Sequence, residues 1–153
     1  MLLMLDIDGV MVQASPWKRV ELLNDGFYEF MPRAVDGLRK IISETGASIV
    51  LTTSHKSTYS LIEWEAIFKK RGIEADIFKL EDNTDFLSRK EEIMRWVTKN
   101  QDYKDFVIVD DDKSLHDLPK EIKEKVVFTQ PYVGLKEENV TNAIEILCGE
   151  VCA

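Results

Sequence analysis

The stretch Met1-Leu-Leu-Met-Leu-Asp-Ile-Asp-Gly-Val10 decides how the rest of the chain is interpreted. Its apolar run stops at two carboxylates, Asp6 and Asp8, and Gly9 follows them. A short apolar run that ends near a glycine is typical of a buried strand in a parallel sheet. Ligands of open α/β sheets bind beyond the carboxyl ends of such strands. Two acids at that edge repel one another and are costly to desolvate, so the pair indicates a site for a cation.

Short apolar segments alternate with segments of helical periodicity along the 153 residues. The expected strands are 2–5, 47–51, 75–80, 106–109 and 126–129; the expected helices are 32–46, 57–71, one opening at Ser88, 115–123 and 137–147. This alternation predicts an α/β fold, a doubly wound (Rossmann-like) five-stranded parallel sheet with helices on both faces. We expect a single domain over residues 1–147, a tail over 148–153, and a small hairpin or flap over about 11–31, where turn signals cluster.

The composition narrows the class of protein. The formal charge of −8 produces no overall attraction for nucleic acid, so the net charge does not indicate a nucleic-acid partner. Nucleic acid is still possible as a partner, because a local basic surface could bind it. Charges near the expected site are mixed, with basic Lys18, Arg19, Arg33, Lys56 and Lys113 against acidic Glu21, Asp25 and Glu29. No signal peptide or membrane-spanning run is present, which predicts a cytoplasmic location without membrane contact. Cys148 and Cys152 are expected to be spare thiols.

Several polar residues should meet at one edge of the sheet. Right-handed crossovers place all strand carboxyl ends on the same side, so Asp6 and Asp8 should converge with Thr52 and with the acidic pair Asp110 and Asp111.

A cation is expected from the helix before the fourth strand, whose first turn contains Lys90. Arg89 competes with Lys90, and Thr53 with Thr52, because strand and helix boundaries are uncertain by a residue or more. Ser54 is a further candidate for a phosphate contact. Asp112 should be solvated or cap the next helix, and the loop histidines His55 and His116 are expected at the surface rather than in catalysis.

This order of acidic pair, hydroxyl, lysine and acidic pair resembles the haloacid dehalogenase-like (HAD) superfamily of phosphohydrolases over nearly the whole chain. The matching segments are Asp6-Ile7-Asp8-Gly9-Val10, Ile49-Val50-Leu51-Thr52, Lys90 and Val107-Ile108-Val109-Asp110-Asp111. The Gly-Val after the first acids and the run of three aspartates resemble the small domains of this superfamily that are associated with RNA-repair proteins.

The resemblance implies roles for these residues. It implies a Mg²⁺ cofactor bound by the Asp6 carboxylate, the Asp8 backbone carbonyl and Asp111, with Asp110 as the alternative acidic ligand. Asp6 would be the nucleophile and form an aspartyl-phosphate, and Asp8 would serve as general acid and then general base. Thr52 and Lys90 would bind the phosphate, a site that Gly9, Thr53 and Ser54 would complete.

Segment lengths leave no room for the cap domain that members of this superfamily commonly insert, so the site should be open. An open site favours a phosphate on a large molecule, either a nucleic-acid end or a phosphoprotein. Two alternatives stay open: a non-catalytic phosphate-binding or scaffold domain, and a small-metabolite or nucleotide phosphatase capped by an oligomer partner. The sequence does not determine the oligomeric state.

Overall fold

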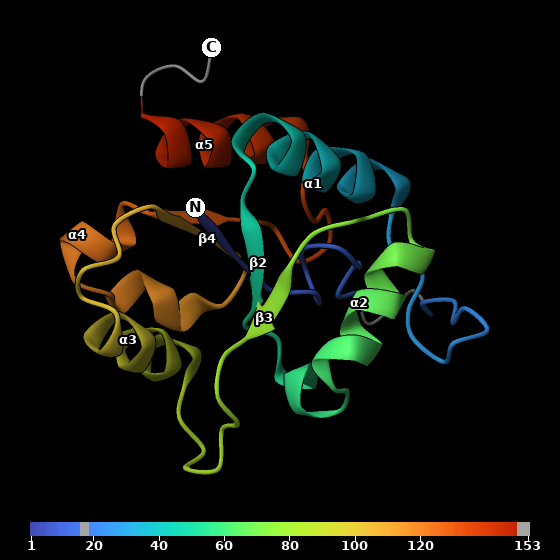
Figure 1. The fold of residues 1–153 in the computed structure, drawn as a ribbon, viewed down its shortest axis with the longest axis horizontal. Helices are drawn as coiled ribbons and strands as arrows, with labels where there is room; N and C mark the ends of the chain where they lie inside the picture. The colour runs from blue at the N-terminus through green and yellow to red at the C-terminus, as the bar shows by residue number, and fades with distance from the viewer. Residues whose placement is uncertain (16–18, 150–153) are drawn as a thin grey trace.

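A computed structural model describes residues 1–15 and 19–149 and contains one five-stranded parallel sheet (Figure 1). The strands are β1 (Leu2–Leu5), β2 (Ser48–Leu51), β3 (Ile77–Lys79), β4 (Phe106–Asp110) and β5 (Val126–Phe128). Their order is β3-β2-β1-β4-β5, and every neighbouring pair is parallel. The predicted Rossmann-like architecture is therefore confirmed, with the strand that begins the chain at the centre of the sheet.

Helices cover both faces of this sheet (Figure 1). They are α1 (Pro32–Thr45), α2 (Leu61–Lys70), α3 (Arg89–Lys99), α4 (Lys120–Lys123) and α5 (Glu137–Cys148), with short 3₁₀ helices η1 (Ser54–Ser57) and η2 (Lys113–Asp117). Alternate residues of β1 face different sides: Leu3 and Leu5 pack in the core under α1, α2 and α5, whereas Met4 packs in the core under α3. Leu3, Met4 and Leu5, at successive positions of β1, are thus all buried, as expected for a central parallel strand.

Two helical segments differ from the prediction for local reasons. Helix α2 begins at Leu61 rather than at residue 57, because Ser60 and Glu63 form a capping box in which each side chain accepts the other's backbone N–H. The expected helix 115–123 is divided into η2 and α4 by Pro119, which directly precedes α4 and lacks the N–H that a continuous helix needs. The capping box predicted at Ser88 is confirmed, with Glu91 as its partner.

The described part of the flap is a small hairpin tied to α2. Leu22 and Tyr28 form one antiparallel bridge on either side of the turn. Arg71, just after α2, donates from Nη1 and Nη2 to the two Asp25 carboxylate oxygens at 2.7 and 3.0 Å, and from Nε to the Tyr28 carbonyl at 2.8 Å. The Arg71 hydrogen bonds lower the pKa of Asp25 to about 2. The flap is therefore anchored to the domain, and no cap domain is inserted among the residues that the structure describes.

The end of α5 corrects one expectation. Cys148 is disulfide-bonded and not a spare thiol. The sequence contains one other cysteine, Cys152, which lies outside the described residues. None of the described helices is both long and apolar enough to cross a membrane.

Candidate active site

Three aspartates meet at the carboxyl edge of the sheet. Leu5 of β1 pairs with Val109 of β4, so Asp6 lies beside the Asp110–Asp111 pair. One carboxylate oxygen from each of the three residues lies within 4.8 Å of the other two. Asp6 is 5% exposed and Asp110 is fully buried, while Asp111 is half-buried. Asp6 therefore lies together with the Asp110–Asp111 pair, as the topology predicts.

The cluster carries more negative charge than its surroundings neutralise. Burial raises the pKa of Asp6 well above its usual value, and the charge of Asp110 adds to this effect, while Arg89 acts in the opposite direction. Burial also raises the pKa of Asp111. Because three closely spaced carboxylates supply the hard oxygen ligands that Mg²⁺ prefers, these residues fit a divalent cation.

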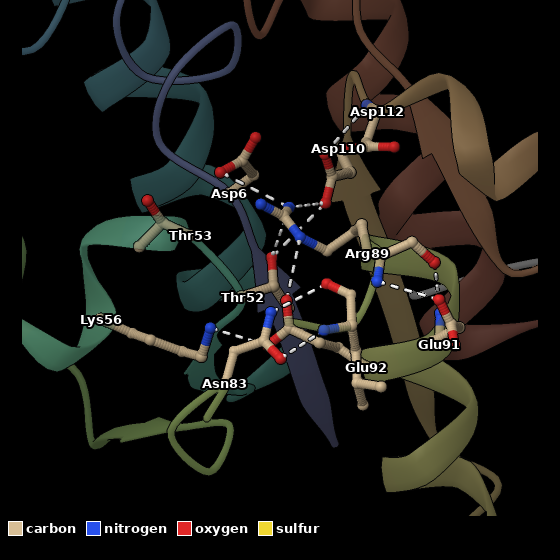
Figure 2. Close-up of polar contacts among 12 residues, drawn as sticks. Asp6, Thr52, Thr53, Lys56, Asn83, Arg89, Glu91, Glu92, Asp110 and Asp112 are labelled. Carbon is tan, nitrogen blue, oxygen red and sulfur yellow. Dashed lines mark hydrogen bonds and ion pairs between the residues drawn. The ribbon is translucent and has the colours of Figure 1, made fainter. Parts of the chain in front are cut away.

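Arg89 is the cation that contacts the acids, and Figure 2 shows its guanidinium between Asp6, Thr52 and Asp110. Its Nη1 donates a short hydrogen bond to Asp110 Oδ2 and lies 3.6 Å from Asp6 Oδ1. Burial by itself would lower the pKa of Arg89, but Asp110 and Asp6 raise it above its ordinary value. Arg89 is therefore charged at any accessible pH.

Lys90 was predicted in this position with Arg89 as the alternative, and in the structure it is Arg89 that contacts the acids. Arg89 is the first residue of α3, after the Ser88 cap, and consecutive helical residues point about 100° apart, so only one of the two can face the sheet edge. The backbone N–H of Lys90 donates to Ser114 Oγ at 3.1 Å. Its ammonium forms no ion pair with any residue that the structure describes.

The two threonines after β2 have different partners. Thr52 is fully buried, and its Oγ1 lies 3.5 Å from Asp110 Oδ2 and 3.4 Å from Arg89 Nη1, which places Thr52 in the cluster. Thr53 caps η1 instead, because its Oγ1 accepts the His55 backbone N–H at 3.2 Å. Ser54 is exposed and takes no part in the carboxylate cluster.

The three consecutive aspartates, Asp110, Asp111 and Asp112, make different contacts. Asp110 Oδ1 accepts the backbone N–H groups of Asp111 and Asp112 at 2.8 and 3.0 Å, and its Oδ2 accepts Arg89. Both carboxylate oxygens of Asp110 therefore already accept hydrogen bonds. Asp111 is for this reason the better candidate for a metal ligand. Asp112 caps η2 by accepting the Ser114 N–H at 2.9 Å, as expected.

Gly9 provides the space that Asp111 occupies. A Cβ on Gly9 would lie 2.1 Å from Asp111 Oδ2, and the φ of Gly9 is +81°. The carbonyl oxygen of Gly9 accepts a hydrogen bond from the buried Thr129 Oγ1 at 2.7 Å, a contact that the sequence did not indicate. The loop after β1 is thus held in a conformation suited to glycine, directly against the proposed metal ligand.

Gly9→Ala is expected to destabilise the domain and to weaken Mg²⁺ binding. Gly26→Ala is a matched control, since Gly26 has a φ of +83° and a Cβ added there would have no atom within 4 Å. Both changes carry the left-handed backbone cost of about 1–2 kcal/mol, but only Gly9→Ala also displaces Asp111. Urea unfolding should show the larger loss for Gly9→Ala, and Mg²⁺ titration should show weakening for Gly9→Ala alone. Equal Mg²⁺ affinities in the two variants would contradict the role assigned to Gly9.

Asp8 lies apart from the carboxylate cluster. Its Oδ2 is 2.8 Å from His55 Nε2, its side chain is 44% exposed, and it lines a cavity of about 620 Å³. The other lining residues come from the flap: Arg19, Val20, Glu21, Leu22 and Tyr28. His55 was expected at the surface rather than in catalysis; in the structure its ring packs against the flap and contacts Asp8. His116 is exposed, as expected, and stacks on Phe128.

A buried ion pair beneath Arg89 was also missed. Lys56 Nζ lies 2.7 Å from Glu92 Oε2, and Glu92 Oε1 lies 3.9 Å from Arg89 Nε (Figure 2). Lys56 was predicted as one of the mixed charges near the site, but its ammonium is buried in this ion pair and is not a surface charge. The i,i+3 spacing of Arg89 and Glu92 was the one available signal. Acidic and basic groups alternate from Asp110 through Arg89 and Glu92 to Lys56, which fixes Arg89 from both sides.

Comparison with known proteins agrees with this geometry. A model of the family described as the HAD domain in Swiss Army Knife RNA repair proteins matches residues 2–140. A search of the curated proteins and a search of the solved structures each returned no match. The family match covers all five strands of the sheet and the complete aspartate cluster. The chain therefore belongs to the family of HAD domains found in Swiss Army Knife RNA repair proteins.

Proposed function

We propose that this domain is a Mg²⁺-dependent phosphohydrolase that removes a terminal phosphate from RNA through an aspartyl-phosphate on Asp6. Membership of a HAD family supports a phosphate-related hydrolase role, and the RNA-repair context of the family supports the substrate class. The observation that carries the proposal is the cluster of Asp6, Asp110 and Asp111 around Arg89, next to Asp8 on a cavity.

The first chemical step follows from the two acids on the β1 loop. An Asp6 carboxylate oxygen attacks phosphorus in line, and the bond from phosphorus to the leaving oxygen breaks. Asp8 donates its proton to the leaving oxygen, which departs as an alcohol. Asp6 and Asp8 are suited to these separate tasks because Asp6 is buried beside a fixed cation, whereas Asp8 is half-exposed on the cavity.

The second step regenerates the enzyme. Asp8 accepts a proton from a water molecule, whose oxygen attacks phosphorus and releases inorganic phosphate and the Asp6 carboxylate. Arg89 and the Thr52 hydroxyl, which contact each other beside Asp6, would donate hydrogen bonds to phosphate oxygens. Mg²⁺ bound by Asp6, Asp111 and the Asp8 carbonyl would supply the positive charge that lets an anionic nucleophile meet a dianionic phosphate.

The cavity beside Asp8 supports a large, partly apolar leaving group. Its volume of about 620 Å³ is within the usual range of ligand sites, and its wall combines the cation Arg19 with the apolar Leu22 and the aromatic Tyr28. Leu22 is 60% exposed, which leaves apolar surface available to a substrate. Aromatic side chains stack on unpaired bases, and a guanidinium binds phosphodiesters, so this wall suits the end of a single strand.

The test is release of inorganic phosphate from a panel of esters in Mg²⁺ and in EDTA. The panel contains RNA oligonucleotides with a 5′- or a 3′-phosphate, DNA of the same sequence, nucleoside monophosphates, phosphopeptides and sugar phosphates. We expect Mg²⁺-dependent release from an RNA end, and a loss of about 10³-fold or more in Asp6→Asn.

Other outcomes identify the alternatives. Release that survives Asp6→Asn contradicts the mechanism. If phosphopeptides are hydrolysed in preference to RNA, the substrate is a phosphoprotein rather than RNA. Efficient hydrolysis of sugar phosphates by an oligomer indicates a site capped by a partner subunit. Absence of release from every ester, combined with phosphate binding, indicates a scaffold.

A further inference from the structure

We infer that His55 is a positioning residue for Asp8, which it holds in the orientation that protonates the leaving oxygen. The inference rests on the proposed function. The contact is direct, since His55 Nε2 lies 2.8 Å from Asp8 Oδ2. Among the described residues, no other side chain bonds to the Asp8 carboxylate. His55 is thus the one described group that restricts how this half-exposed carboxylate turns.

The imidazole is itself held in place. The His55 backbone lies in η1, where its N–H donates to Thr53 Oγ1 at 3.2 Å. Its ring meets Phe27 and Tyr28 of the flap edge to face, with centroid separations of 5.6 and 5.7 Å and interplanar angles of 86° and 75°. A ring packed in this way against a pair of contacting aromatic side chains has little freedom to rotate.

The flap that carries these aromatic rings is fixed by a buried cation. The Arg71 side chain is 2% exposed and donates hydrogen bonds to Asp25 and to the Tyr28 carbonyl. Its guanidinium lies 5.6 Å from the centre of the Phe27 ring. A chain of contacts therefore runs from Arg71 through the flap to His55 and Asp8.

The contact suits a proton donor. A neutral imidazole that carries its proton on Nε2 donates to Asp8 Oδ2 whether or not Oδ1 is protonated, so the same hydrogen bond serves both steps. Asp8 Oδ1 then remains for the leaving oxygen: its proton moves to that oxygen as the phosphorus–oxygen bond breaks and the bond to Asp6 forms. A positioned acid or base contributes about 10²–10⁴-fold, and misorientation loses part of that factor.

The experiment compares two phosphate esters whose leaving groups differ in their need for a proton. An alkoxide such as that of β-glycerophosphate leaves slowly without protonation, whereas 2,4-dinitrophenolate leaves readily without it. We expect His55→Ala to lower kcat/KM for β-glycerophosphate by about 10-fold or more, with a change of less than about 3-fold for 2,4-dinitrophenyl phosphate. His55→Gln should restore most of the loss, because its amide N–H can reach Asp8.

Two controls separate positioning from damage to the fold. His116→Ala removes the other histidine, which also stacks on an aromatic ring, and should leave both substrates unaffected. In an Asp8→Asn background, adding His55→Ala should produce little further loss with β-glycerophosphate.

The outcomes that contradict the inference are specific. An equal loss with both esters, a full additional loss in the Asp8→Asn background, or failure of His55→Gln to restore activity would show a merely structural role. Wild-type inactivity toward both esters and toward phosphorylated RNA ends would instead contradict the proposed function. For a wild type that acts only on an RNA end, His55→Ala should lower kcat/KM there by about 10-fold or more, because the ribose oxygen is also a poor leaving group without protonation. An active wild type with an unaffected His55→Ala contradicts only the role of His55.

Discussion

Arg89→Met is expected to lower the free energy of unfolding by about 3–5 kcal/mol, because Asp110 would remain buried without its charged partner. Asp110 is fully buried and Arg89 is its only cationic contact among the described residues. Asp6 and Glu92 would lose a cation as well. Urea unfolding at pH 7 without Mg²⁺ measures the effect.

Lys90→Met is the matched control, since it removes a cation of the same helix turn that lies outside the cluster. We expect it to change stability by less than about 0.5 kcal/mol. Arg89→Lys should be intermediate, because an ammonium keeps the charge but cannot span Asp110, Asp6 and Thr52 with a planar fork. Arg89→Met combined with Asp110→Asn should recover part of the loss, since no unpaired charge remains. A larger loss for Lys90→Met than for Arg89→Met would contradict the assignment of Arg89.

The sheet and the aspartate cluster were predictable because they depend on strong and independent signals. The strands are short apolar runs, and parallel topology brings their carboxyl ends together whatever the details of the loops. Asp6 and Thr52 directly follow such strands and Asp110 is the last residue of one, so their meeting required only the correct order of elements. The predicted capping box at Ser88 likewise depends on neighbouring residues alone.

Whether Arg89 or Lys90 enters the site depends on how the helix is rotated about its axis. The pattern of apolar residues does not determine which side chain of the first turn faces the sheet edge. Helix α3 starts one residue before the predicted lysine, and this places Arg89 toward the cluster. The Ser88 cap located the start of this helix correctly, but the sequence does not show which of two neighbouring first-turn side chains faces the sheet edge.

His55 and Lys56 were missed because their partners are remote in sequence. His55 is placed by aromatic residues of the flap and by Asp8, and Lys56 by Glu92 of α3. A polar run after a strand is usually a solvated loop. Only the three-dimensional packing of the flap, η1 and α3 shows that these two side chains are directed inward.

Asp6→Asn is expected to raise the melting temperature of the Mg²⁺-free domain at neutral pH while it removes the response to Mg²⁺. The pKa of Asp6 is raised above its usual value by burial and by Asp110, so the folded state favours its protonated form. Such a group stabilises the fold at low pH, and this contribution is lost as the pH rises through its raised pKa. Asparagine does not titrate, so the advantage of Asp6→Asn should grow with pH, by about 2–4 °C for each ~1 kcal/mol in a domain of this size. Thermal unfolding from pH 4 to pH 8 in EDTA measures it.

Added Mg²⁺ should change the melting temperature of the wild type and of Asp6→Asn differently. A cation that binds only the folded wild type stabilises it by about 2.7 kcal/mol at 100 times its Kd. Mg²⁺ should therefore raise the melting temperature of the wild type but leave Asp6→Asn unchanged, which reverses their order between EDTA and saturating Mg²⁺. Asp102→Asn, which neutralises an exposed acid, should behave like the wild type in both conditions. Equal Mg²⁺ stabilisation of Asp6→Asn and the wild type would place the cation elsewhere, because the loss of a carboxylate ligand from a three-aspartate site must weaken binding.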